Sequence, residues 1–207
     1  MRSLAKRIIS HFKRPIHVTP NDTVQFLEPE PIQVKTLFVS AGHSDVDPGA
    51  TGHGYTEADI VLEFRDLVAM ELRDLGVEFD KDGEKGQNLP LRTAISAAKN
   101  HDVAVEWHCN AFSNSTATGV ETLCADPTNT LSNALCDTTA TVLGIRNRGT
   151  KSEASGQHSR LGFVSTGGGI IHELFFITNP ADLAAYHANK RQLAYEVAKV
   201  LADEVRE

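Results

Sequence analysis

Two histidines and a glutamate lie in this sequence where they could form a metal site. His43 follows an apolar run, Val34 to Val39, and Glu57 opens the amphipathic pattern that comes next. A strand end and a helix start are rigid supports, so both side chains could face one point. His108 lies in a second apolar segment and is the candidate third ligand. Two histidines, a carboxylate and an open position make up the ligand set of a catalytic zinc site.

Glu173 lies in a third apolar segment, IIHELFFITN. A carboxylate in such a strand is costly to bury unless it is paired or its pKa is raised. A general base that serves a water beside a metal is the natural use of such a residue. His172 should face the other side of the strand, as a packing or surface histidine, because side chains alternate.

Each of these residues also has a simpler explanation. A histidine after a strand is commonly a loop residue, and the DPGATG segment after His43 would suit a plain tight turn. The helix macrodipole favours an acid such as Glu57 in the first turn without any metal. His108 could be a hydrogen-bonded core histidine. Taken one at a time, the residues leave both explanations open.

Four neighbouring residues have roles that the sequence leaves open. Strand alternation places Cys109 away from the face of His108 and Glu106 on that face. Glu106 could hold His108 in place, or it could be a solvent-facing acid. His53 and His158 lie in predicted loops, where each could line a cleft or take no part.

The segments AGHSDVDPGATG, YTEAD, EWHCNAF and HELFFITNPAD resemble, in order and spacing, the zinc-dependent N-acetylmuramoyl-L-alanine amidases of the type-3 family. The resemblance extends from about Val34 to the C-terminus. It implies that His43, Glu57 and His108 bind Zn²⁺ and that Glu173 is the catalytic carboxylate. It also implies that the substrate is peptidoglycan, cut at the amide bond between N-acetylmuramic acid and L-alanine.

Some positions depart from the family pattern. Ser44 and Asp45 follow His43 where the family usually has glycine, Glu106 stands where serine is common, and Phe175 replaces a usual glycine. These departures remove no ligand, but they leave the shape of the substrate groove open. No HExxH motif occurs, which excludes a thermolysin-like site.

The chain of 207 residues is long enough for one α/β domain with a full core. Apolar runs predict strands, and 3.6-residue periodicity predicts helices between them. The expected strands cover 34–40, 77–79, 102–107, 119–124, 161–164 and 170–176, and the expected helices cover 56–75, 91–99, 128–143 and a final segment from Asn179 or Asp182. This alternation predicts a mostly parallel twisted sheet with helices on both faces. Functional sites in such folds collect at the carboxyl ends of strands.

The predicted domain organisation has three parts. Residues 1–14 are basic and amphipathic, residues 15–33 form a Pro-rich linker, and residues 34–207 form the zinc amidase domain. A basic amphipathic helix can lie on an anionic membrane surface, so weak membrane contact through residues 1–14 is one expectation. Docking on the catalytic domain, or a frayed tail, is the alternative.

Charge and cysteine content narrow the biological setting. The net charge of −7 argues against a nucleic-acid partner. Three cysteines without a CxxC pair suggest synthesis in a reducing compartment. The basic start lacks the apolar core of a secretory signal. We therefore expect a monomeric, phage endolysin-like enzyme that is made in the host cytoplasm and acts on the cell wall after release.

Two other functions fit the same residues. One is a zinc peptidase or carboxypeptidase that acts on wall peptides. The other is a non-catalytic peptidoglycan-binding virion protein that retains the site without using it. The products released from the cell wall would distinguish these three possibilities.

Overall fold

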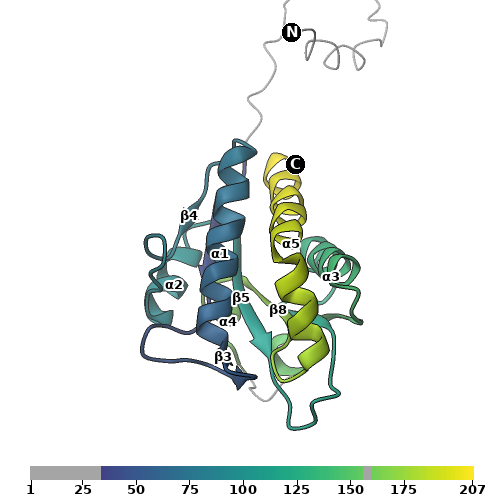
Figure 1. The fold of residues 1–207 in the computed structure, drawn as a ribbon. Helices are drawn as coiled ribbons and strands as arrows, with labels where there is room; N and C mark the ends of the chain where they lie inside the picture. The colour runs from purple at the N-terminus through teal and green to yellow at the C-terminus, as the bar shows by residue number, and fades with distance from the viewer. Residues whose placement is uncertain (1–33, 156–159) are drawn as a thin grey trace, which may run out of the picture. The chain divides into compact units, whose positions relative to one another are not determined.

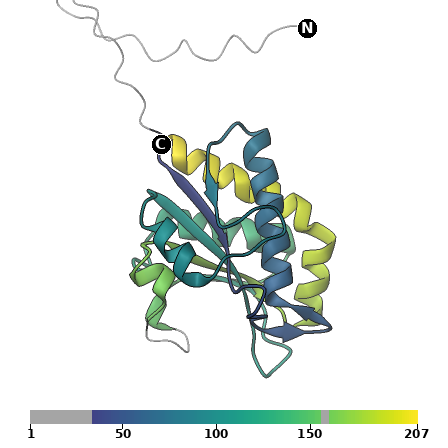
Figure 2. The same ribbon diagram turned by 90° about the vertical axis from the view of Figure 1, so that its left-hand side faces the viewer.

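The computed structural model describes residues 34–155 and 160–207. Residues Gln33–Glu207 form one compact unit, in which a central sheet lies between two layers of helices (Figures 1 and 2). The expected basic segment 1–14 and linker 15–33 lie outside the described residues, as does His158. Membrane contact through residues 1–14 therefore stays a prediction.

The main sheet has six strands in the order β4-β1-β5-β8-β6-β7. Strands β4, β1, β5 and β8 pair in parallel, whereas β6 is antiparallel to β8, and β7 is parallel to β6. The predicted mostly parallel sheet is confirmed. In chain order the strands are β1 (Leu37–Ala41), β4 (Asp80–Lys81), β5 (Val103–Asn110), β6 (Val120–Cys124), β7 (Asn147–Ser152) and β8 (Ile170–Phe176), and β2 (Thr51–Gly52) and β3 (Tyr55–Thr56) form a separate hairpin.

Helices cover both faces of the sheet, as predicted. One face carries α1 (Glu57–Asp74), α3 (Thr130–Leu143) and α5 (Pro180–Arg206), with α1 and α5 side by side (Figure 1). The other face carries α2 (Leu91–Ala98) and α4 (Gly162–Ser165), and a 3₁₀ turn, η1 (Glu153–Ser155), follows β7. Within the described residues, none of the helices combines the length and apolar character needed to cross a bilayer.

Local sequence accounts for where the two longest helices begin. Thr56 caps α1, where its Oγ1 accepts the backbone N–H of Asp59 at 3.1 Å, as the sequence predicts. Asn179 caps α5, and Pro180 occupies its first turn, where the missing N–H costs nothing. The cap of α1 matters for function because it places Glu57 at the first position of the helix.

The core is divided unequally between the two faces of the sheet. The larger cluster includes Phe64, Trp107 and Tyr186 beneath α1 and α5. The smaller cluster, under α2 and α4, includes Phe38 and Phe163 and meets β5 and β8 near their beginnings, at Ala104 and Ile171. Polar side chains therefore occupy the carboxyl ends of β5 and β8 on this second face.

Some element predictions were wrong. Residues 161–164 form no strand, because Ser165 N–H donates to the Leu161 carbonyl at 2.8 Å and closes the helical turn of α4. A short apolar run does not distinguish a strand from a buried helical turn. The strand expected at 77–79 begins later in the chain, at Asp80, and forms β4. Strand β7 was missed because its sequence, NRGTKS, has no apolar alternation.

His172 faces away from Glu173, as predicted, and is fully buried. The surface alternative is therefore wrong for this residue. Its Nδ1 lies 2.8 Å from Thr122 Oγ1 and its Nε2 lies 2.9 Å from Thr139 Oγ1. Burial lowers the pKa of His172 to about 3, so the ring is neutral in the folded protein at neutral pH.

We expect His172 to make the metal-free protein less stable in acid. The unfolded chain binds a proton near pH 6.5, whereas the folded chain excludes that proton until about pH 3. Lowering the pH from 6.5 to 5 should therefore reduce the free energy of unfolding by roughly 2 kcal/mol through His172. Urea unfolding in a chelator at pH 7 and pH 5 measures the loss, and His172→Gln should reduce it. A surface change, His53→Gln, serves as the control. Equal pH dependence in wild type and His172→Gln would contradict the prediction.

Candidate metal centre and substrate cleft

Three side chains from three separate elements converge at the carboxyl edge of the sheet. His43 lies in the loop after β1, Glu57 begins α1 and His108 belongs to β5. Each offers one ligand atom, and these atoms all lie within 4.8 Å of one another. The structure therefore brings together the three ligands predicted from the sequence.

The Glu57 carboxylate lies between the two histidine rings. Its Oε2 is 3.0 Å from His43 Nε2, and its Oε1 is 2.9 Å from His108 Nδ1. The backbone N–H groups of Ala50 and Cys109 also donate to it, each at 2.9 Å. Burial acts to raise the pKa of Glu57, but the hydrogen bonds with the two rings outweigh burial and hold that pKa below its usual value. Glu57 is therefore anionic, as a carboxylate that binds a metal must be.

Two glycines allow this close approach. A side chain at Gly42 would collide with the His108 ring. At Gly49, where φ is +64°, a Cβ atom would lie 2.6 Å from His43 Nε2 and 2.7 Å from Glu57 Oε2. The Gly-rich segment after His43 is therefore part of the site, and the plain-turn explanation does not account for it.

Carboxylates contact the outer nitrogens of both histidines. His43 Nδ1 lies 3.2 Å from Asp47 Oδ2, and His108 Nε2 lies 3.0 Å from Glu106 Oε1. Glu106 is 2 % exposed and shares the face of His108, as predicted, so its solvent-facing alternative is wrong. These contacts orient the inner nitrogens, Nε2 of His43 and Nδ1 of His108, toward the shared point.

A series of hydrogen-bonded, buried polar side chains contacts Glu106. Ser40 Oγ lies 3.2 Å from Glu106 Oε2 and 3.0 Å from Asp82 Oδ2. Arg65, which is fully buried, donates from Nη1 to Asp82 Oδ1 at 3.0 Å. The cation of Arg65 offsets part of the negative charge that is buried behind the site.

Glu173 lies beside His108, because these residues are register partners on β8 and β5. Its Oε2 is buried and has no hydrogen-bond partner within residues 34–155 and 160–207. Burial raises the pKa of Glu173 to about 7. A carboxylate with this pKa can exchange a proton at neutral pH, as a general base requires.

The charge balance of the site favours a cation. Burial alone would lower the pKa of His43 and His108, but the hydrogen bonds and charges of Glu57 and Glu106 raise it instead. Positive charge between these groups is therefore stabilised. Two imidazoles, one carboxylate and a nearby buried acid fit Zn²⁺ in a catalytic site with an open position.

The ligand group opens into a cavity of about 790 Å³. Glu173 and Glu121 line the cavity, together with Arg148 and Lys151 of β7 and the exposed Phe112. Sequence reasoning missed Glu121, Arg148 and Lys151. Alternation along 119–124 puts Glu121 on one face with Leu123, but no local pattern shows which strands lie beside it.

Within the described residues, neither Cys109 nor His53 belongs to the metal-ligand group, although Cys109 lines part of the cavity. Cys109 packs in the larger core cluster, away from the His108 face, as predicted. His53 Nε2 lies 3.2 Å from the Thr178 carbonyl oxygen, and His53 is absent from the described lining of the cavity.

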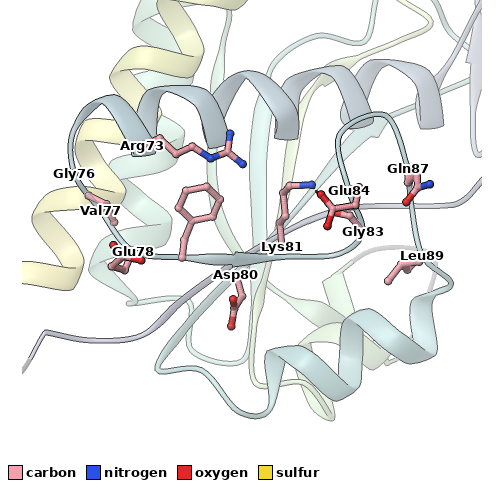
Figure 3. Close-up of a pocket in the computed structure, with 11 residues that line it drawn as sticks. Arg73, Gly76, Val77, Glu78, Asp80, Lys81, Gly83, Glu84, Gln87 and Leu89 are labelled. Atoms are coloured by element: carbon pink, nitrogen blue, oxygen red, sulfur yellow. Dashed lines mark hydrogen bonds between the residues drawn. The ribbon is translucent and has the colours of Figure 1, made fainter.

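A second hollow of about 800 Å³ lies at the end of α1, beside β4 (Figure 3). The guanidinium of Arg73 lies 5.4 Å from the centre of the Phe79 ring. Lys81 Nζ donates to the Gly83 carbonyl (Figure 3). In the part of the chain that the structure describes, the metal-ligand group occurs in the first cavity and not here.

Comparison with known proteins finds relatives of this chain that are described as N-acetylmuramoyl-L-alanine amidases. A Neisseria meningitidis crystal structure, described as that of a candidate N-acetylmuramoyl-L-alanine amidase, is 38% identical, with a TM-score of 0.76 over 82% of this chain and 95% of that chain. The Bacillus subtilis protein YqiI is 35% identical over 95 residues, which are 45% of this chain and 46% of YqiI. The B. subtilis N-acetylmuramoyl-L-alanine amidase LytC is 28% identical over 161 residues, 73% of this chain.

The chain spans less than half the length of these two curated relatives, and the LytC match covers 31% of LytC. The sequence profile of the family Amidase_3, described as N-acetylmuramoyl-L-alanine amidase, matches residues 37–203. This match covers His43, Glu57, His108 and Glu173. The chain therefore belongs to the Amidase_3 family of N-acetylmuramoyl-L-alanine amidases.

Proposed function

We propose that this protein is a peptidoglycan hydrolase that cleaves the amide bond between the lactyl group of N-acetylmuramic acid and L-alanine. The observation that carries the proposal is the convergence of His43, Glu57 and His108 beside Glu173, in one cavity of a chain from the amidase family. His43, Glu57, His108 and Glu173 all line this cavity, whose volume is about 790 Å³.

We propose that His43 Nε2, His108 Nδ1 and the Glu57 carboxylate hold Zn²⁺. Bound zinc lowers the pKa of a coordinated water toward roughly 7 and polarises the scissile carbonyl. The protein contributes the orientation of both rings, through Asp47 and Glu106, and the close approach that Gly42 and Gly49 permit.

Glu173 acts as the general base in this proposal. Its unpartnered Oε2 accepts a proton from the attacking water, and the resulting acid donates that proton to the leaving amine of L-alanine. In the metal-free protein burial raises the pKa of Glu173 to about 7, so this carboxylate takes up and releases a proton near neutral pH.

Product analysis on purified peptidoglycan tests the reaction. The amidase should release stem peptides with a free L-alanine amino group and leave a free carboxyl on each lactyl group, and mass spectrometry detects both. A zinc peptidase or carboxypeptidase would release amino groups but would leave the lactyl carboxyl of muramic acid in its amide bond. A non-catalytic wall-binding protein would release nothing, with or without added zinc.

We expect Glu106→Ala to weaken zinc binding by about 10–100-fold, because carboxylates behind metal-bound histidines typically contribute that much. Glu106→Gln is the matched control, since its amide oxygen can still accept the N–H of His108. Zinc affinity is measured by competition with a chromogenic chelator, and circular dichroism verifies the fold. Equal affinity in wild type and Glu106→Ala would show that Glu106 does not position His108.

We also propose an endolysin role, in which the protein is made in a host cytoplasm and reaches the wall after release. All three cysteines are free and buried, which fits a reducing compartment. Expression in bacteria with and without a pore-forming membrane protein tests this role. Lysis should require both proteins, and lysis by this protein alone would contradict release through a pore.

A further inference from the structure

Four neighbouring strands align charged side chains along the face that carries the metal-ligand group. His108 of β5 is the register partner of Glu173 on β8, and Glu173 is in turn the partner of Glu121 on β6. Strand β7, with Arg148 and Lys151, pairs with β6 on its far side. Neighbouring strands lie about 4.8 Å apart, so the backbone of β7 is about 10 Å from that of β8. This distance corresponds to roughly three residues of an extended peptide.

Arg148 and Lys151 share one acidic partner. Arg148 Nε lies 2.5 Å and Lys151 Nζ lies 2.6 Å from the same atom, Glu121 Oε2. Asn110 Nδ2 donates to the other oxygen, Glu121 Oε1, at 3.0 Å. Both oxygens of Glu121 therefore accept hydrogen bonds. Glu121, Arg148 and Lys151 together carry one net positive charge, in a chain whose net charge is −7.

The two cations remain accessible from the cavity. Their side chains are 28% and 30% exposed, against 10% for Glu121, and all three residues line the cavity. The guanidinium carbon of Arg148 lies 4.9 Å from the centre of the Phe176 ring, within the range of a cation–π contact. Gly119 leaves room for the Arg148 stem, because a Cβ atom there would lie 3.0 Å from its Cγ and Cδ.

The terminal nitrogens of Arg148 are available for a ligand. Within residues 34–155 and 160–207, the guanidinium donates a hydrogen bond to the protein through Nε alone. Its two terminal amino groups can bind a carboxylate in the bidentate geometry that arginine favours. Among the described residues that line the cavity, Arg148 and Lys151 supply the arginine and lysine cations, so an anionic group of a ligand is expected to bind there.

We propose that Arg148 and Lys151 form a subsite that binds a carboxylate of the stem peptide, beyond the L-alanine whose amide bond is cut. This inference rests on the proposed amidase function. The subsite would orient the peptide across β6, with the scissile amide at Glu173 and the carboxylate at β7. It would also make the enzyme discriminate between stems that carry a free carboxylate and stems that carry a carboxamide.

A pair of synthetic muramoyl peptides tests the subsite. The two differ in one respect, since the carboxylates beyond L-alanine in one are carboxamides in the other. Wild type should have the lower KM for the carboxylate form. Arg148→Gln should raise that KM about 10–100-fold with a smaller effect on kcat, because a hydrogen bond to a charged group contributes about that much. The ratio of kcat/KM for the two peptides should fall toward one. Lys151→Gln, which leaves Arg148 paired with Glu121, should lower the ratio less.

Lys190→Gln is the matched control, because Lys190 forms an ion pair with Glu63 outside the cavity and should leave the ratio at its wild-type value. Two results would overturn the subsite: an equal loss of kcat/KM on both peptides in Arg148→Gln, or equal kcat/KM on both peptides in wild type. Arg148 and Glu121 would then form a structural ion pair only.

Binding measured without turnover separates this inference from the proposed reaction. Calorimetry with the Glu173→Gln protein should show tighter binding of the carboxylate peptide, and the added Arg148→Gln change should remove the preference. If wild type cleaves neither peptide but this preference is present, the proposed reaction fails and the subsite stands. If cleavage occurs without any preference in binding or turnover, the subsite fails and the reaction stands.

Discussion

Glu173→Gln is expected to keep its zinc and its fold and to lose about 10²–10⁴-fold of its wall-hydrolysing activity. Glutamine has nearly the same shape as glutamate but cannot accept the proton of the attacking water. The unpartnered Oε2 and the pKa of about 7 both indicate a group that acts on a proton rather than one that holds the fold together. Dye release from labelled peptidoglycan measures the activity, and elemental analysis measures the zinc.

Glu63→Gln is a suitable control for this experiment, because Glu63 is on the exposed side of α1 and pairs with Lys190. Two results would contradict the assignment. Loss of zinc from Glu173→Gln would mean that Glu173 is a ligand. Activity near the wild-type level would mean that the general base is another residue.

Removal of a histidine ligand should have the second large effect. We expect one zinc per chain in the wild type, and His43→Ala or His108→Ala should lose most of it, because each ring supplies one of three ligand atoms within 4.8 Å of one another. Acid should release the metal as well, since a protonated imidazole cannot coordinate. His53→Ala, which changes a histidine outside the cavity, should retain the metal.

Metal content by mass spectrometry, with activity assayed before and after chelation and zinc addition, measures this effect. Full wall hydrolysis in a rigorously metal-free sample would exclude zinc catalysis. Full zinc content in His108→Ala would show that the metal lies elsewhere.

Local sequence determined the parts of this protein that depend on neighbours along the chain. The Thr56 cap follows from the residue types at the helix start, and it places Glu57 at the site. The two-residue repeat of a strand placed Glu106 with His108 and turned Cys109 toward the core. Apolar strands that end in a histidine or contain a glutamate therefore indicate the candidate site residues from the sequence alone.

The tertiary structure alone decided which strands are neighbours and in which direction they run. Because β6 is antiparallel to β8, its beginning and not its end lies at the site, which brings Glu121 beside Glu173. Strand β7 then places Arg148 and Lys151 at the far side of the cavity, although its own sequence lacks a strand pattern. Pairing of this kind depends on packing between segments far apart in the chain, and local periodicity carries no information about it.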